Sequence, residues 1–142
     1  MENTDNQANQ LSQAAILITR ALQVQKRSVR AYEIIANTAP AAKERDLLLS
    51  IRREERRHYY LLEGIYEELT GQAYNPSRQG LSLPRHYQDM LKTALCDKLA
   101  AIDFYEELRG HIDCVRNQLL LELILDEQKE HAKILAVLYD QC

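Results

Sequence analysis

A chain of 142 residues, 46% hydrophobic and 27% charged, has the size and balance of one soluble globular domain with its own core. Its formal net charge of -3 predicts no strong attraction to nucleic acid or to an anionic membrane. No apolar run approaches the length of a membrane span, and residues 1–5 lack the basic start of a signal peptide. We therefore expect a cytoplasmic protein.

The three cysteines show no spacing typical of a metal site or of a disulfide framework. Cys96, Cys114 and Cys142 are an odd set without a Cys-x-x-Cys pair. Neither a disulfide framework nor an iron site of four thiolates is therefore expected. We predict two packed thiols and one at a frayed C-terminus, with an intermolecular bridge through Cys142 as the alternative.

The first half of the chain predicts two helices. Only four Gly and three Pro residues occur in the whole sequence, which favours an all-α fold. Residues 1–9 are polar and predicted to be disordered. Apolar residues at three- and four-residue steps then predict a helix over residues 11–37. After a turn at Pro40, the same steps predict a second helix over residues 42–70, which ends at Gly71.

The second half predicts two more helices after a long linker. Residues 71–84 show no periodicity and contain several helix breakers. Fully extended, this linker reaches roughly 40 Å, enough to traverse the length of a helical bundle. Helices are then predicted over residues 85–109 and 114–139. Two helical hairpins joined by one long crossover predict a ferritin-like four-helix bundle, a single domain over residues 10–142.

The sequence also contains an internal repeat. A shift of 73 residues superposes the first half, about residues 11–70, on the second, about residues 84–142, without gaps, and the offset holds in both helices of each half. The matched pairs include Ala21 with Ala94, Leu22 with Leu95, Tyr32 with Tyr105, Glu33 with Glu106, Ile51 with Ile124, Glu54 with Glu127, His58 with His131 and Leu62 with Leu135. The sequence therefore predicts a duplicated helical hairpin.

Polar residues interrupt the apolar seams of the predicted helices at one level. In the second helix, the three- and four-residue steps from Ile51 to Leu62 pass through Glu55 and His58. Burying an ionised carboxylate without a partner is costly, so side chains on the other helices must pair with it. The repeat and the other seams predict one polar layer of six side chains: Gln25, Glu55, His58, Lys98, Gln128 and His131.

Several segments resemble the rubrerythrin-type branch of the ferritin-like superfamily, over nearly the whole chain from about Leu11. They are the Tyr-Glu segments at Tyr32 and Tyr105, the Glu-Glu-x-x-His segment that ends at His58, and residues 126–131. The resemblance implies two iron or manganese ions between the helices. It implies as ligands one Glu from each of helices one and three, and a Glu-x-x-His motif from each of helices two and four.

Only part of that ligand set is present. Glu55, His58 and His131 match the family pattern, whereas three positions where the family has Glu hold Gln25, Lys98 and Gln128. A lysine ammonium about 5 Å from a divalent ion costs about 6 to 7 kcal/mol at an effective dielectric of about 20. We therefore predict a substituted di-metal site and no bound cofactor. A buried Lys98–Glu55 ion pair would take its place, with the two amides and two imidazoles completing the network.

Two other uses of the layer stay open. Glu55, His58 and His131 form a two-His-one-carboxylate set suited to a single Fe(II) or Zn(II) ion. Since the resemblance also implies manganese, any bound metal would be Fe, Mn or Zn. The resemblance also extends to radical-generating relatives that work without metal. In that case Tyr32 or Tyr105 would store a radical, whereas packing in the core is the ordinary role of such tyrosines.

Glu54 and Glu127 occupy equivalent positions under the repeat, each four residues before a histidine. The resemblance implies that each carboxylate orients the histidine of the opposite helix. The alternative is a π-bulge that turns Glu127 into the seam, where it would act as a ligand.

The substituted site determines the interpretation of function. We expect a non-catalytic structural or interaction protein with no catalytic residue. The alternative is a metal-binding oxidoreductase or iron-handling protein. Whether the chain is an enzyme therefore stays open. Tyr59, Tyr60 and Tyr66 broaden the apolar stripe of the second helix, which predicts a homodimer, and an unidentified protein partner fits the non-catalytic role. A basic strip around Arg53 and Arg57 is interpreted as a solvated face.

Overall fold

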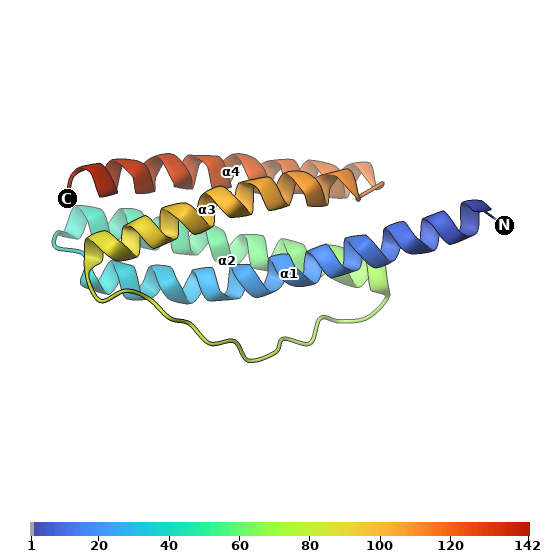
Figure 1. The fold of residues 1–142 in the computed structure, drawn as a ribbon, viewed down its shortest axis with the longest axis horizontal. Helices are drawn as coiled ribbons and strands as arrows, with labels where there is room; N and C mark the ends of the chain where they lie inside the picture. The colour runs from blue at the N-terminus through green and yellow to red at the C-terminus, as the bar shows by residue number, and fades with distance from the viewer. Residues whose placement is uncertain (1) are drawn as a thin grey trace.

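The computed structural model describes the backbone of residues 2–142 and the side chains of residues 13–142. It contains four helices: α1 (Glu2–Thr38), α2 (Ala42–Thr70), α3 (Tyr87–Gly110) and α4 (Val115–Asp140). The first two helices form one antiparallel hairpin and the last two form another, and the hairpins pack side by side (Figure 1). No strand occurs in the described backbone. The predicted all-α four-helix bundle is confirmed.

The crossover between α2 and α3 determines the direction of the second hairpin. The α2 helix ends at Gly71, whose φ of 70° lies in the left-handed region and whose N–H donates to the Glu67 carbonyl oxygen. The linker then runs back along the outside of the bundle to the opposite end (Figure 1). Because of this long return, α2 and α3 run in the same direction, as in bundles with one long crossover.

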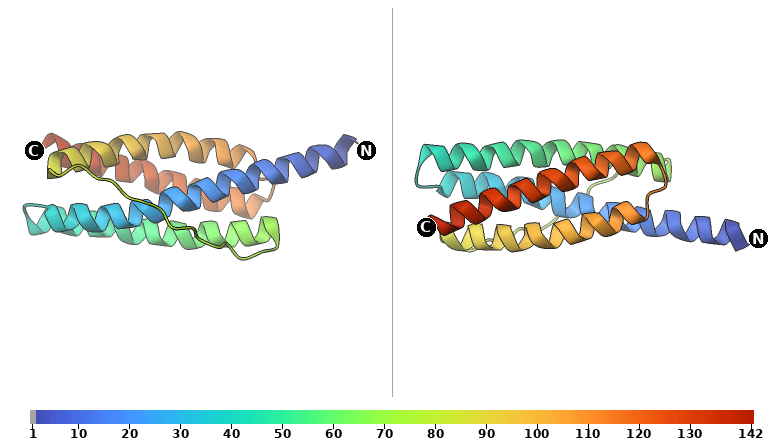
Figure 2. Two further views of the ribbon diagram at one scale, coloured as in Figure 1. Left: turned by 60° about the horizontal axis from the view of Figure 1, so that its bottom comes forward. Right: turned by 90° about the horizontal axis from the view of Figure 1, so that it is seen from above.

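The N-terminal turns of α1 project beyond the ends of the other helices (Figure 2). The structure begins α1 at Glu2, whereas the sequence predicts a disordered segment over residues 1–9. A helical segment with no neighbour depends on intrinsic propensity alone, which is weak in water. The disorder of these residues therefore stays a prediction, and Met1 lies outside the described residues.

The linker packs on the tyrosines that broaden the apolar stripe of α2. The ring of Tyr74 lies edge-on to Tyr66, with centroids 5.3 Å apart, and edge-on to Tyr59, with centroids 6.5 Å apart. Such edge-to-face pairs are favourable arrangements of aromatic rings. The linker of the same chain therefore packs on two of the three tyrosines, Tyr59 and Tyr66, whereas Tyr60 remains 61% exposed.

The core consists of two apolar clusters, one on each side of a polar layer. One cluster includes Ile18, Leu22, Leu62, Ile65, Leu108, Leu121 and Ile124. The other includes Ile35, Leu48, Ile51, Leu91, Leu135 and Leu138. Each buried Leu or Ile side chain contributes about 1.5–3 kcal/mol to folding. The apolar ends therefore supply the stability that holds the polar layer between them.

The expectation of packed thiols is wrong. Cys96, Cys114 and Cys142 are all exposed. The buried face of α3 runs through Leu91, Ala94 and Lys98, so Cys96 lies on the other side of the helix.

Within the described residues, no helix is both long enough and apolar enough to cross a membrane.

Candidate functional site

The structure brings together all six polar side chains that the seams and the repeat single out. All four helices contribute: Gln25 comes from α1, Glu55 and His58 from α2, Lys98 from α3, and Gln128 and His131 from α4. Each has a relative exposure of 4% or less. Because these residues occupy seam positions, the same periodicity that buries the leucines also buries them.

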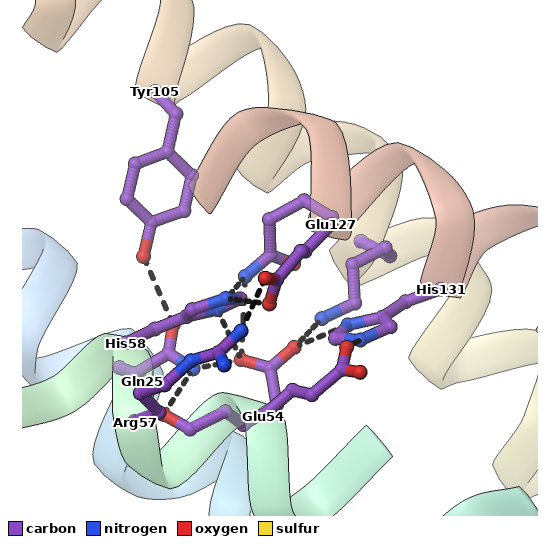
Figure 3. A network of polar contacts seen from close by, with 10 residues as sticks. Gln25, Glu54, Arg57, His58, Tyr105, Glu127 and His131 are labelled. Carbon is purple, nitrogen blue, oxygen red and sulfur yellow. Dashed lines mark hydrogen bonds and ion pairs between the residues drawn. The ribbon is translucent and has the colours of Figure 1, made fainter. Parts of the chain in front are cut away.

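The Glu55 carboxylate is the centre of the layer. Figure 3 shows the polar network of the layer, with Gln25, His58 and His131 converging from different helices. Its Oε1 forms an ion pair with Lys98 Nζ and lies 3.0 Å from His131 Nδ1. Its Oε2 accepts from Gln25 Nε2 and, at 3.3 Å, from Gln128 Nε2. The Gln25 amide also donates to the backbone carbonyl of Glu55 at 2.9 Å. Four side chains from three other helices therefore direct hydrogens at one buried carboxylate.

This environment keeps Glu55 ionised. Burial raises the pKa of the Glu55 carboxyl, but the Lys98 ammonium and the hydrogen bond from His131 lower it more, to about 2. The charge–charge attraction is strong because little water screens it in the interior. The carboxylate is thus stabilised by its partners in the same chain.

Glu54 and Glu127 lie just outside the layer, each facing the histidine of the opposite helix. His58 Nε2 lies 2.7 Å from Glu127 Oε2, and His131 Nε2 forms the equivalent hydrogen bond with Glu54 Oε2. The two imidazole rings stack between them, with centroids 6.0 Å apart. The helix α4 stays a regular α-helix from Val115 to Asp140, so Glu127 reaches His58 without a π-bulge.

The two histidines have different hydrogen-bond partners. His58 Nδ1 lies 3.2 Å from Gln128 Nε2, an atom that only donates, so Nδ1 accepts and Nε2 carries the hydrogen. Burial lowers the pKa of His58, although the Glu55 and Glu127 carboxylates partly offset this. The nitrogens of His131 instead both lie against carboxylate oxygens, Nδ1 against Glu55 Oε1 and Nε2 against Glu54 Oε2.

Gln128 supports this assignment of hydrogens. Its Nε2 lies between the Glu55 carboxylate and His58 Nδ1, and its Oε1 is buried without a partner among the described residues. Turning the amide over would place its oxygen against the carboxylate, and the two acceptors would repel each other. The unpaired carbonyl oxygen is therefore the less costly arrangement.

The two tyrosines related by the repeat support the layer reciprocally. The Tyr105 hydroxyl, on α3, donates to Gln25 Oε1 on α1 at 2.9 Å. Lys98 Nζ, on α3, lies 5.3 Å from the centre of the Tyr32 ring on α1, within range of a cation–π interaction. Burial raises the pKa of both phenols well above 10, so both stay protonated.

The metal ions that the resemblance implies do not fit this set of side chains. A divalent ion needs acceptor atoms around it, whereas the Lys98 ammonium and the Gln25 and Gln128 amides present hydrogens to Glu55. Among the described residues, no three His, Cys, Asp or Glu side chains are arranged to hold one metal ion. His58 Nδ1 lies 4.0 Å from Glu55 Oε2 and accepts a hydrogen bond from Gln128, so its lone pair does not face a metal ion.

Two polar contacts are absent from the sequence predictions, one beside the layer and one outside it. Arg57 pairs with Glu127 Oε1, although its position favours a solvated strip. The only signal was its place directly before His58. Asn117 is buried and donates to Glu68 Oε2 at 2.9 Å. It lies four residues before Leu121, so extending the α4 seam by one step finds it.

Comparisons with known proteins show similarity in structure. No protein-family model and no curated protein matches the sequence. A hypothetical protein from Pyrococcus furiosus has a TM-score of 0.80 and 16% identity, covering 89% of this chain and 88% of that chain. A conserved hypothetical protein from Mycobacterium tuberculosis has a TM-score of 0.79 and 14% identity, covering 92% of this chain and 93% of that chain.

A third solved structure is described by its fold. It is a two-domain protein from Anabaena variabilis that contains DJ-1/ThiJ/PfpI-like and ferritin-like domains. The similarity has a TM-score of 0.72 and 17% identity, and covers 92% of this chain and 37% of that chain. At identities this low the similarity concerns the fold alone, and it supports a ferritin-like arrangement of the four helices.

Proposed function

We propose that this chain is a non-catalytic structural or interaction protein on a ferritin-like scaffold whose di-metal site has been substituted. In this proposal the chain comes from a rubrerythrin-type bundle and keeps its polar layer, with the Lys98–Glu55 ion pair at the place of the metal ions. The observation that carries the proposal is that Lys98, Gln25 and Gln128 all direct hydrogens at Glu55.

The contacts of the layer support this proposal because each carboxylate already has a partner without an added cation. Glu55 is paired with the Lys98 ammonium, Glu127 with the Arg57 guanidinium, and Glu54 lies against His131 Nε2. A pair of divalent ions would bring four more positive charges to a layer with one central carboxylate. That excess has no counterpart in the interior, where unpaired charge is costly.

Metal analysis tests the proposal. Purified protein is incubated anaerobically with Fe(II), Mn(II) or Zn(II), freed of unbound ions and measured by elemental analysis. The expected result is less than about one tenth of an ion per chain for each metal. One ion per chain that is lost in His58→Ala and His131→Ala would support the alternative, a metal-binding oxidoreductase or iron-handling protein. Two ions per chain would overturn the proposal.

We also propose that a second copy of the chain is one partner. Tyr60 of α2 remains exposed after the linker covers its neighbours, and it borders a groove with Leu120 of α4. The outer face of α4 adds Val115, Leu119 and Leu123, each between 46% and 67% exposed. Such a stripe fits an isologous contact, in which the same surface meets itself.

Light scattering after size-exclusion chromatography tests the dimer. The expected mass is twice that of the 16.5 kDa chain. A Leu119→Glu/Leu123→Glu variant should elute as a monomer, whereas Leu99→Glu, an equally exposed apolar position on α3, should leave the mass unchanged. A wild-type monomer at all concentrations would refute the dimer, and the chain would then act alone or with another protein.

A further inference from the structure

Two cavities share a wall on the face of the bundle that the crossover covers. The larger, of about 530 Å³, lies between α1 and α3 beneath residues 80–83 of the linker. The smaller, of about 380 Å³, lies between α1 and residues 78–80. Arg27 and Gly80 line both cavities, so the two are neighbours at one mouth.

The larger cavity exists because the facing residues of α1 and α3 are small. Ala21 and Ala31 on α1 and Ala94 and Ala101 on α3 leave a space that neither helix fills. Apolar side chains close its walls: Val24, Leu81, Leu83 and Phe104. A cavity with predominantly apolar walls and a few polar groups suits the body of a small organic molecule.

The smaller cavity is lined by four cationic side chains: Lys26, Arg27, Arg30 and Arg78. All four are exposed, and none forms an ion pair with a carboxylate among the described residues. Gln79 lines the same cavity; its backbone carbonyl oxygen accepts from Arg30 at 3.4 Å, and its side-chain Oε1, an acceptor, is buried without a partner among the described residues. Four uncompensated cations around one hollow form an environment suited to an anion with more than one negative charge.

We propose that this face binds a small amphiphilic organic phosphate. The phosphate group would occupy the cationic cavity, where guanidinium groups form paired hydrogen bonds to phosphate oxygens. The apolar body would pass Arg27 and Gly80 into the space between α1 and α3. The larger cavity is lined by Arg27 and Asp97 and by the Lys98–Glu55 pair, so it has no excess of positive charge, and the negative group belongs in the smaller one. This binding goes beyond the structural role proposed above and needs no metal.

Titration calorimetry with octyl phosphate below its micelle concentration tests the proposal. The expected result is saturable binding of one molecule per chain, at least tenfold tighter than inorganic phosphate and at least tenfold tighter than octyl maltoside. The difference from inorganic phosphate measures what the apolar cavity contributes to the affinity. The difference from octyl maltoside measures what the cationic cavity contributes. Equal affinity for all three probes, or no saturable binding, would overturn the proposal.

Charge variants locate the phosphate group. Arg30→Gln/Arg78→Gln should weaken octyl phosphate binding at least tenfold. The matched control is Arg53→Gln/Arg56→Gln, which removes two exposed cations from α2 and should change the affinity less than twofold. Similar losses in both double variants would mean that net charge alone drives binding, which would overturn the assigned site.

A cavity variant locates the apolar body. Ala31→Leu adds bulk where α1 lines the larger cavity. It should weaken octyl phosphate at least tenfold while inorganic phosphate binds as in the wild type, which also shows that the cationic cavity remains folded. Unchanged octyl phosphate binding would overturn the proposal. Binding seen only with vesicles that contain phosphatidic acid, and not with monomeric octyl phosphate, would assign the cations to a membrane surface and also overturn it.

Discussion

Lys98 Nζ and Glu55 Oε1 form an ion pair inside the bundle, on helices that belong to different hairpins. Lys98 is 4% exposed and Glu55 is fully buried. A buried pair of this kind gains little compared with apolar packing, but removing one partner leaves the other charge alone in the interior. The two residues therefore depend on each other, and several testable consequences follow from that dependence.

The stability of the protein should fall in acid. The folded pKa of Glu55 is about 2, below the ordinary value of 4.5. A carboxyl whose pKa is lowered on folding contributes stability above its unfolded pKa and loses it as the pH falls towards the folded pKa. The expected contribution is about 3 kcal/mol at pH 7, lost between about pH 5 and pH 2.

Urea denaturation of the wild type and Glu55→Gln over this pH range measures the contribution. The difference in unfolding free energy between the two should shrink as the pH falls. Because the pKa of Glu127 is also lowered, by His58 and Arg57 against the effect of burial, a Glu127→Gln variant separates the second carboxylate. A constant difference between the wild type and Glu55→Gln would mean that the Glu55 pKa is not lowered.

His58 should be neutral near pH 7, with its one ring hydrogen on Nε2. Burial lowers the pKa of His58, and its ring accepts at Nδ1 and donates from Nε2. Long-range ¹H–¹⁵N correlation spectra distinguish the tautomers of a histidine directly. A neutral His58 ring with its hydrogen on Nε2 is expected. A hydrogen on Nδ1, or on both nitrogens, would show that the assigned hydrogen-bond directions are wrong.

Glu127 should stabilise the fold more than a neighbouring surface carboxylate. Glu127 is 20% exposed in its side chain and holds His58 as well as Arg57. Its replacement in Glu127→Ala should lower the unfolding free energy by about 1–2 kcal/mol, because a hydrogen bond to a buried ring is lost. The matched control Glu130→Ala removes an exposed pair with Lys133 and should cost less than about 0.5 kcal/mol.

Restoring carboxylates should create a metal site. A Gln25→Glu/Lys98→Glu/Gln128→Glu variant would have four carboxylates and two histidines in the layer, the set that the rubrerythrin-type resemblance implies. We expect it to bind about two Fe(II) or Mn(II) ions per chain. Gln25→Glu/Gln128→Glu, which keeps the lysine, is the control and should bind far less. A triple variant without metal would show that the helices are no longer spaced for two ions.

The sequence was sufficient to predict the polar layer because helical periodicity controls which side chains face inward. Glu55 and His58 continue the apolar steps of α2, and the 73-residue repeat then pointed to Lys98 as their neighbour. The contacts of Glu127 with His58 and of Glu54 with His131 are expected from the resemblance to rubrerythrin-type proteins rather than from periodicity.

Features that depend on the linker or on the flanks of helices could not be predicted in this way. Tyr74 packs on Tyr59 and Tyr66 from a segment without periodicity, so no pattern indicated the contact. The reach of Arg57 to Glu127 depends on the rotation of α2 relative to α4, and a helix flank carries little information about it. Arg78 joins the cationic cavity for the same reason, through the path of the linker.

A double-mutant cycle between Lys98 and Glu55 tests the central claim most directly. The unfolding free energies of the wild type, Lys98→Met, Glu55→Gln and the double variant are measured in urea at pH 7 without added metal. Each single variant should lose about 3–5 kcal/mol, and the double variant should lose at least about 2 kcal/mol less than the sum of the two. Losses that simply add would contradict the claim that this ion pair holds the layer together.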